Sequence, residues 1–166
     1  MILQKFFPID QLSIETRKFQ DSKIPPSLLI QNHTYLDIRG ANVPITLDEL
    51  LLINSKAINI ESLQIRPKEI NKFIKLWQQG SNPRMEHLRF GYFDTEEAMK
   101  GIKHEVVPYN RRRLFKPTGL ANPYEINGGL DIYRIDGVKA TIKFEWDWNT
   151  SKSDMYVWFD HCVVES

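Results

Sequence analysis

The sequence predicts an α/β fold: a short, leucine-rich-repeat-like parallel sheet with flanking helices, closed by an antiparallel C-terminal hairpin and strand. Three observations support this prediction. Strand and helix patterns alternate through the first part of the chain, which implies right-handed crossovers and a parallel sheet. Three of the strand patterns share the spacing apolar-x-apolar-x-x-apolar. Apolar residues then recur at alternate positions, which is typical of antiparallel strands.

The three similar strand patterns resemble a degenerate repeat. Each predicts one strand, at residues 35–38, 57–60 and 87–90. Their apolar positions begin at Leu36, Ile58 and Leu88, so successive copies start 22 and 30 residues apart. The first spacing lies within the leucine-rich-repeat period of roughly 20–29 residues, and the second lies just outside it. An ordinary α/β sandwich with coincidental spacing is the alternative, because three irregular copies are a weak repeat signal.

Two capping signals predict short helices between the strands. Thr46 and Glu49 form a capping box, because the Thr46 hydroxyl can accept a hydrogen bond from the Glu49 amide while the Glu49 side chain bonds back. This box predicts a helix to about Ile53. Residues 94–97 carry a similar signal, DTEE, which predicts a second short helix to about Ile102.

A longer helix is predicted between Pro67 and Gly80. Proline suits the first helical position, because its missing N–H would have no helical partner there. Glycine favours the end of a helix, and Pro83 prevents continuation. The apolar residues in between follow the helical period and form one stripe that should face the sheet: Ile70, Phe73, Ile74 and Trp77.

The C-terminal part is expected to be antiparallel. Gly128-Gly129 is predicted as a turn before a strand. Residues 132–135 and 138–146 then flank Asp136-Gly137, a preferred pair for a type I′ hairpin because both central positions need positive φ. Residues 155–159 predict a further strand, with a turn at 149–153 before it. This antiparallel end would cover the open edge of the parallel sheet.

Length and composition favour a single globular domain. The chain has 166 residues, enough for a sizeable core, and its apolar fraction of 42% is ordinary for a globular protein. Residues 1–27 are weakly patterned and end near a proline pair, so they are predicted as an N-terminal connector, with a short strand as the alternative. Residues 28–166 are predicted as the domain itself.

Charge and cysteine content narrow the classes of protein to which the chain can belong. The net charge of +1 gives no general attraction to nucleic acid or anionic membranes. No apolar run approaches the roughly 20 residues that a membrane helix needs, and the first residues lack the features of a signal peptide. The single cysteine, Cys162, permits no internal disulfide, which fits a reducing compartment. We therefore expect an intracellular protein, cytoplasmic or nuclear.

Two stretches of the sequence resemble a known family. The first combines EINKFIKLW at 69–77 with GSNPRMEHL at 80–88, and the second is GGLDIYRIDGVKATI at 128–142. The segment MYVW at 155–158 is similar to the closing strand of that family. Together these stretches resemble the type 2 F-box-associated domain that occurs in many nematode proteins.

The resemblance implies a protein-protein interaction module. In that family the domain lies behind an F-box and is thought to select the target of a Skp-cullin-F-box type ubiquitin ligase. The expected partner is a target protein whose identity the sequence does not give. A Skp-type adaptor would bind only through an F-box, and residues 1–30 show no convincing F-box pattern. We expect either the C-terminal piece of a longer protein or a variant without the ligase link.

No catalytic, cofactor-binding or metal-binding residues are predicted. The four histidines lack metal-ligand spacing, and no phosphate loop, dinucleotide fingerprint or nucleophile elbow is present. Asp160-His161-Cys162 suggests a thiol–imidazole pair, but neighbours in a strand point to opposite faces and would not meet. We therefore predict that the chain is not an enzyme, with a small enzyme of unrecognised site as the alternative.

The sequence concentrates positive charge in one run of three arginines. Arg111, Arg112 and Arg113 could receive an acidic peptide, a phosphorylated residue or a nucleic-acid backbone. They could equally protect an edge strand from aggregation. A phosphate- or nucleic-acid-binding domain is thus an alternative function, but nucleic acid is not the expected partner because no known nucleic-acid motif accompanies the run.

The open face of the parallel sheet is a second predicted binding surface. In an apolar-x-apolar strand, the intervening side chains point away from the core. They would form a row of mixed charge across neighbouring strands, and repeat proteins commonly bind partners on such a face. A merely solvated face is the alternative. The predicted partner-binding residues here are Asp37, Arg39, Asn59, Glu61 and Arg89.

Overall fold

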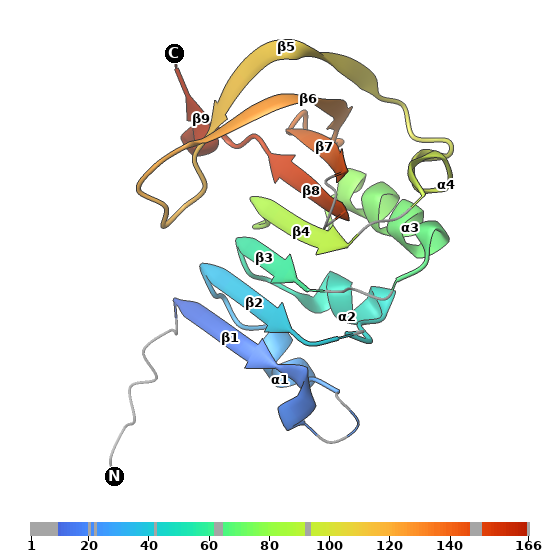
Figure 1. The fold of residues 1–166 in the computed structure, drawn as a ribbon, viewed down its shortest axis with the longest axis vertical. Helices are drawn as coiled ribbons and strands as arrows, with labels where there is room; N and C mark the ends of the chain where they lie inside the picture. The colour runs from blue at the N-terminus through green and yellow to red at the C-terminus, as the bar shows by residue number, and fades with distance from the viewer. Residues whose placement is uncertain are drawn as a thin grey trace.

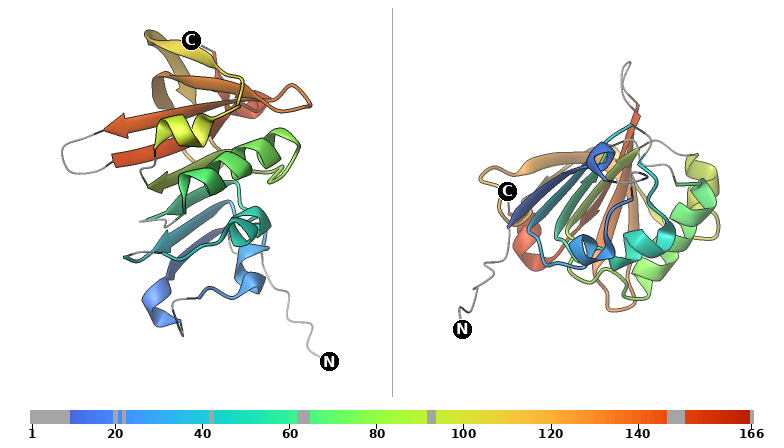
Figure 2. Two further views of the ribbon diagram at one scale, coloured as in Figure 1. Left: turned by 90° about the vertical axis from the view of Figure 1, so that its right-hand side faces the viewer. Right: turned by 90° about the horizontal axis from the view of Figure 1, so that it is seen from below.

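The computed structural model describes residues 10–19, 21, 23–41, 43–61, 65–91, 94–146 and 151–165. These residues form one mixed sheet of nine strands, in the order β1-β2-β3-β4-β8-β7-β6-β5-β9 (Figure 1). The four short α-helices of the described part gather on one side of the sheet, as the views in Figure 2 also show. None of the described helices has the length and apolar character that crossing a membrane requires.

Four strands at one end of the sheet are parallel to one another. They are β1 (Gln11–Glu15), β2 (Tyr35–Arg39), β3 (Ala57–Ile60) and β4 (His87–Gly91). The chain returns between them through helices on one face of the sheet, namely α1 (Pro26–Leu29), α2 (Leu47–Leu52) and α3 (Pro67–Gln78). The three strands predicted from the repeated pattern are β2, β3 and β4, and β1 adds an edge strand from within residues 1–27.

The other five strands are antiparallel. They are β5 (Glu105–Phe115), β6 (Tyr124–Tyr133), β7 (Lys139–Trp146), β8 (Ser151–Val157) and β9 (Val163–Val164). A short helix, α4 (Thr95–Met99), leads from β4 towards β5. The two halves join where β8 pairs antiparallel with β4.

The predicted fold class, a short leucine-rich-repeat-like parallel sheet with an antiparallel cap, is wrong. The sheet is large and mixed, and three of the four described helices have only four to six residues. The sequence hides β5 and β6, which have 11 and 10 residues. Pro108 and Asn110 in β5 disfavour a strand by local propensity, and so does Gly128-Gly129 in β6. That glycine pair, expected as a turn, lies inside β6.

The capping signals are confirmed. The Glu49 N–H donates to Thr46 Oγ1 at 3.2 Å, and the Thr46 N–H donates to Glu49 Oε2 at 2.9 Å. Asp94 caps α4 by accepting from the Glu97 N–H at 3.1 Å.

Part of the turn expected at 149–153 lies outside the described residues, and its last three positions belong to β8.

The turn between β6 and β7 differs from the expected type I′ turn. A type I′ turn needs positive φ at both central residues. Gly137 has a φ of 88°, but Asp136 does not have positive φ. The Gly137 N–H donates to the Arg134 carbonyl at 2.9 Å, and the Arg134 N–H donates to the Val138 carbonyl at 2.8 Å. This is a three-residue hairpin loop with glycine at the left-handed position.

The apolar stripe of α3 is confirmed as part of the main core. Its residues are at most 1% exposed and belong to one cluster with apolar residues of β2, β3 and β4: Ile70, Phe73, Ile74 and Trp77. A smaller cluster lies on the opposite face, because Tyr156 alternates along β8 with the core residues Met155 and Val157. Its buried members are Phe115, Ile126, Tyr156 and Cys162.

Asn82, in the GSNPR run, holds the end of α2 from a distant part of the chain. It is buried at a φ of 49°, and its Nδ2 donates to the carbonyls of Leu50 at 3.0 Å and Ile53 at 2.9 Å. We expect Asn82→Ala to lower the free energy of unfolding by about 2–4 kcal/mol, because two carbonyls lose their donor and alanine disfavours positive φ. Urea denaturation of the variant and the parent measures this loss.

Asn82→Gly is the matched control, because glycine adopts positive φ without strain. This variant should lose only the hydrogen-bond contribution and should therefore be more stable than the alanine variant. A loss below about 1 kcal/mol for Asn82→Ala would show that the two hydrogen bonds do not anchor α2.

Candidate functional site

The sheet face opposite the helices carries the first set of predicted residues. Strand register places Asp37, Asn59 and Arg89 side by side across β2, β3 and β4. Strand β8 continues the line with Asp154, which lies opposite Arg89. We call these four residues the polar row. The predicted cross-strand alignment of Asp37, Asn59 and Arg89 is therefore present.

Hydrogen bonds compensate the charges of the polar row internally. Asp37 accepts from Asn59 Nδ2 at 2.9 Å and from Arg39 Nε at 2.6 Å. Asp154 accepts from Arg89 Nε at 2.8 Å. Both carboxylates are buried, so Asp37 lies on the predicted face but is not presented to solvent. The predicted residues that keep exposure on this face are Arg39 and Glu61 and, in part, Asn59 and Arg89.

Sequence reasoning missed His87 and Asp154. His87 Nε2 lies 2.7 Å from Asp154 Oδ1, and the imidazole stacks on Tyr156 with ring centroids 4.9 Å apart. Burial opposes ionisation of Asp154, but hydrogen bonds from His87 and Arg89 outweigh it and lower the pKa of this carboxyl. The pair is 67 positions apart in sequence, so only the pairing of β4 with β8 brings it together.

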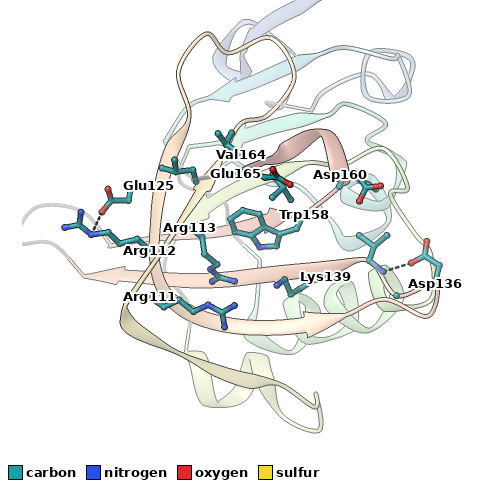
Figure 3. A pocket seen from close by; sticks show the side chains of 15 residues that line it. Arg111, Arg112, Arg113, Glu125, Asp136, Lys139, Trp158, Asp160, Val164 and Glu165 are labelled. Atoms are coloured by element: carbon teal, nitrogen blue, oxygen red, sulfur yellow. Dashed lines mark hydrogen bonds and ion pairs between the residues drawn. The ribbon is translucent and has the colours of Figure 1, made fainter.

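The predicted arginine run borders a pocket of about 930 Å³ (Figure 3). We call this space the arginine pocket. In Figure 3 the arginines lie at one end, Asp136 and Asp160 lie at the other, and the Trp158 indole lies between them. The pocket is lined by residues 111–114, 125, 136–139, 158–160 and 163–165.

Arg113 is part of the floor of the arginine pocket. Its Nη1 lies 3.0 Å from both oxygens of Asp131, and its Nη2 donates to the Gly128 carbonyl at 3.1 Å. The guanidinium lies over the Trp158 ring, 5.0 Å from the centroid. Trp158 Nε1 in turn donates to Thr141 Oγ1 at 2.8 Å. With its side chain only 11% exposed, Arg113 stabilises the floor and is not free to pair with a partner.

Arg111 and Arg112 are the accessible members of the run. Both are exposed. Arg112 Nε lies 3.5 Å from Glu125 Oε1, and such an exposed ion pair is worth little. The Arg111 guanidinium makes no hydrogen bond or ion pair with any residue in the described ranges. Two of the three arginines predicted to bind a partner, Arg111 and Arg112, are therefore accessible, whereas Arg113 is not.

The far end of the arginine pocket is acidic. Arg134 donates two hydrogen bonds to Asp136, at 2.9 and 2.7 Å, and these lower the pKa of Asp136 to about 2. Asp160, on the same side in Figure 3, is exposed. The pocket thus presents charges of both signs, and Glu125 also brings a carboxylate to the arginine end, beside Arg112. Such a mixed surface favours a partner with a complementary charge pattern.

A buried carboxylate, Glu86, joins three segments beneath the second cluster. Glu86 Oε2 accepts from the Thr118 N–H at 2.6 Å, and Oε1 accepts from Thr118 Oγ1 at 2.7 Å. His161 Nε2 lies 2.7 Å from the same Oε1, and Lys56 Nζ lies 3.6 Å from it. Burial opposes ionisation of Glu86, but these hydrogen bonds outweigh it, so the pKa of Glu86 is lowered.

The expectation that His161 and Cys162 point apart is wrong. Residues Asp160–Cys162 form a 3₁₀ helix, and not a strand. The donor atoms of Glu86, His161 and Cys162 lie within 4.8 Å of one another, and these residue types can ligate zinc. The Glu86 oxygens already accept several hydrogen bonds, however, and burial raises the pKa of Cys162 to about 12. We interpret the cluster as a hydrogen-bonded junction.

Comparison with known proteins identifies relatives of this chain. The sequence model of a family described as F-box associated matches residues 24–90. The chain is 24% identical over 149 residues to the F-box associated domain-containing protein sdz-33 of Caenorhabditis elegans, which covers 87% of this chain and 43% of that protein. It is 26% identical over 120 residues to the Caenorhabditis elegans protein F59B2.8, covering 68% and 28%. No solved structure matches the chain.

The family match covers part of this chain, and the chain covers part of its relatives. The chain spans less than half the length of the two relatives. The matched residues 24–90 run from α1 to β4, so they include most of the polar row. The arginine pocket lies outside that range.

Proposed function

We propose that this chain, which belongs to the F-box-associated family through residues 24–90, is a protein-interaction domain and not an enzyme. The resemblance seen in the sequence is confirmed by the family match and by the nematode relatives. In the proposed role the domain selects a target protein for a Skp-cullin-F-box type ubiquitin ligase. The ubiquitin chemistry belongs to other subunits, and an F-box connects the domain to a Skp-type adaptor.

The arginine pocket is the proposed target-binding surface. The observation that carries this proposal is the exposure of Arg111 and Arg112 beside a pocket whose floor is fixed by Arg113 and Trp158. Arginine and tryptophan are the residue types that most often dominate binding energy. A floor held by hydrogen bonds also loses little conformational entropy when a partner binds. An acidic segment of the target would pair with Arg111 and Arg112.

Two rival readings have less support from the geometry. The charges of the polar row are compensated, because Asp154 pairs with Arg89 and Asp37 pairs with the neighbouring Arg39. Among the described residues of this face that were predicted to bind a partner, Glu61 is the exposed charge without an ion pair. A nucleic-acid backbone would meet negative charge in the arginine pocket, at Glu125, Asp136, Asp160 and Glu165. These carboxylates would repel the continuous negative charge of a polyanion. A protein can instead place acidic residues at Arg111 and Arg112 and basic residues at the carboxylates.

We expect the double variant Arg111→Glu and Arg112→Glu to capture its protein target at least about tenfold more weakly than the parent, because like charges would then face the acidic segment. Quantitative mass spectrometry of proteins captured from a nematode lysate measures the change. The matched control is Arg17→Glu with Arg66→Glu. It alters net charge equally at two arginines that are each 82% exposed and lie outside the pocket.

A third variant separates the two surfaces. Arg39, Glu61 and Arg89 are replaced together with alanine, and folding of every variant is checked by circular dichroism. If this variant loses a partner that the arginine variant keeps, the binding surface lies on the sheet face. If a partner binds equally to all folded variants, neither predicted surface recognises it, and the proposed site is wrong.

A further inference from the structure

A second, smaller pocket of about 290 Å³ lies on the sheet face, away from the arginine pocket. Strand register places Tyr35, Ala57 and His87 side by side across β2, β3 and β4, and these residues form one wall. The connection between β5 and β6, residues 116–123, forms the other wall. We call this space the tyrosine pocket, defined by Tyr35, Ala57, His87, Pro117, Leu120 and Tyr124.

The tyrosine pocket is preformed. Thr118 is held to Glu86 by two hydrogen bonds, from its N–H at 2.6 Å and from Oγ1 at 2.7 Å. Lys56 Nζ also donates to Thr118 Oγ1, at 3.2 Å. Gly119 adopts a φ of 86°, where a Cβ would come within 3.1 Å of Thr34 Cγ2. The loop that forms the second wall is therefore fixed against the sheet before any partner arrives.

Large side chains remain partly exposed around this space. Tyr35 is 36% exposed, Leu120 is 41% exposed and Tyr124 is 42% exposed. All three line the same pocket, although they come from β2, the connecting loop and β6. Exposed apolar groups that converge on one hollow commonly mark an interaction site. A volume near the lower end of the range for ligand pockets fits a single inserted side chain.

His87 gives the tyrosine pocket a specific polar group. The ring is 9% exposed and is held by its stacking on Tyr156. Its Nε2 lies 2.7 Å from Asp154, whose lowered pKa keeps the carboxylate ionised, so Nε2 carries the proton and donates. In the neutral ring Nδ1 is then an acceptor. Nδ1 has no hydrogen-bond partner among the residues that the structure describes.

We propose that the tyrosine pocket binds one aromatic side chain that carries a hydrogen-bond donor, a tyrosine or tryptophan of the target, with the donor on His87 Nδ1. Tyr35 and Tyr124 offer rings against which an aromatic side chain packs favourably. Buried tyrosine hydroxyls and tryptophan N–H groups usually need a hydrogen-bond partner, and Nδ1 is an acceptor in the neutral form of the His87 imidazole. This inference rests on the proposed function, because a protein target must present the side chain, but it concerns a separate site.

The test uses small probes, so it does not need the target protein. N-acetyl-tyrosinamide, N-acetyl-tryptophanamide and N-acetyl-phenylalaninamide are titrated into the ¹⁵N-labelled chain and followed by two-dimensional NMR. We expect saturable shifts at the amides of residues 35, 87 and 118–120. The tyrosine and tryptophan probes should bind about 2- to 10-fold more tightly than the phenylalanine probe, because only they make a net hydrogen bond.

Two variants on β6 give a matched comparison. Tyr124→Ala removes one wall of the pocket, whereas Tyr133→Ala removes a tyrosine of similar exposure, 44%, that does not line it. We expect the first variant to lose most of the probe binding and the second to keep it. Equal binding by both variants would overturn the pocket, and equal affinity for tyrosine and phenylalanine probes would overturn the role of His87.

The outcomes also separate this inference from the proposed function. Probe binding in the tyrosine pocket, together with a target that ignores the arginine variants, would support the pocket and contradict the arginine site. Loss of target capture in the arginine variants, together with no saturable probe shifts, would contradict the tyrosine pocket and leave the proposed function intact.

Discussion

Replacing Trp77 with alanine is expected to lower the free energy of unfolding by about 3–5 kcal/mol, which is a large part of the stability of an ordinary domain. The indole is fully buried at 0% exposure in the main core. The Arg134 guanidinium also lies over its ring, 5.6 Å from the centroid. Alanine would leave a cavity between α3 and the sheet that the neighbouring side chains can fill only in part.

Chemical denaturation of Trp77→Ala and the parent measures this loss. Trp77→Phe is the control, because it keeps an aromatic ring in the stripe. Trp77 Nε1 is buried without a hydrogen-bond partner in the described part of the structure, so phenylalanine should cost clearly less than alanine. An unchanged melting temperature for Trp77→Ala would contradict the central place of this residue in the core.

Replacing Glu86 with alanine is expected to be similarly severe, at about 3–5 kcal/mol, because the Thr118 N–H and hydroxyl lose their acceptor and the truncation leaves a cavity at a buried position. The groups that would lose their acceptor belong to three segments: Lys56, Thr118 and His161. Denaturation at neutral pH tests this expectation. A variant as stable as the parent would show that the junction is not needed to hold these segments.

The junction should also make stability depend on pH. The folded-state pKa of Glu86 is lowered from an ordinary value of 4.5. The contribution of the carboxylate is therefore fully present above the unfolded-state pKa and is lost as pH falls through the folded-state pKa. We expect the stability difference between the parent and Glu86→Gln to be constant near neutral pH and to shrink below about pH 4.5. A difference that grows as pH falls below about 4.5 would have the wrong sign for this mechanism.

Local signals predicted the helices more successfully than the sheet. The stripe from Ile70 to Trp77 and the two capping signals depend on residues within one or two turns, so the sequence contains them completely. Strands β5 and β6 gain their stability from pairing across the sheet, which overrides the unfavourable propensities of Pro108 and Gly128-Gly129. The sequence alone shows the unfavourable propensity of these residues but not the strand pairing that outweighs it.

In the candidate site, too, features that depend on neighbouring residues were predictable and features that depend on distant strands were not. The arginine run was evident in the sequence, but the commitment of Arg113 to Asp131 was not, because 18 residues separate them. The link between Arg89 and Asp154 spans 65 residues and depends on the register of β4 with β8. The polar row could be predicted as a set of positions. Its internal compensation of charge, which decides which residues remain free, could not be predicted without the pairing of distant strands.

The central place of β8 has a consequence for how the chain acquires its structure in time. During synthesis β4 leaves the ribosome well before β8, and it exposes an unpaired strand edge until residues 151–157 arrive. Neither half of the sheet is complete at that stage, because β7 needs the same strand. Completion of the sheet thus requires β4 to pair with β8, which is distant in sequence. Such a distant contact slows folding and lengthens the time during which the chain can aggregate. A nascent chain of this kind benefits from protection of the β4 edge until β8 has been made.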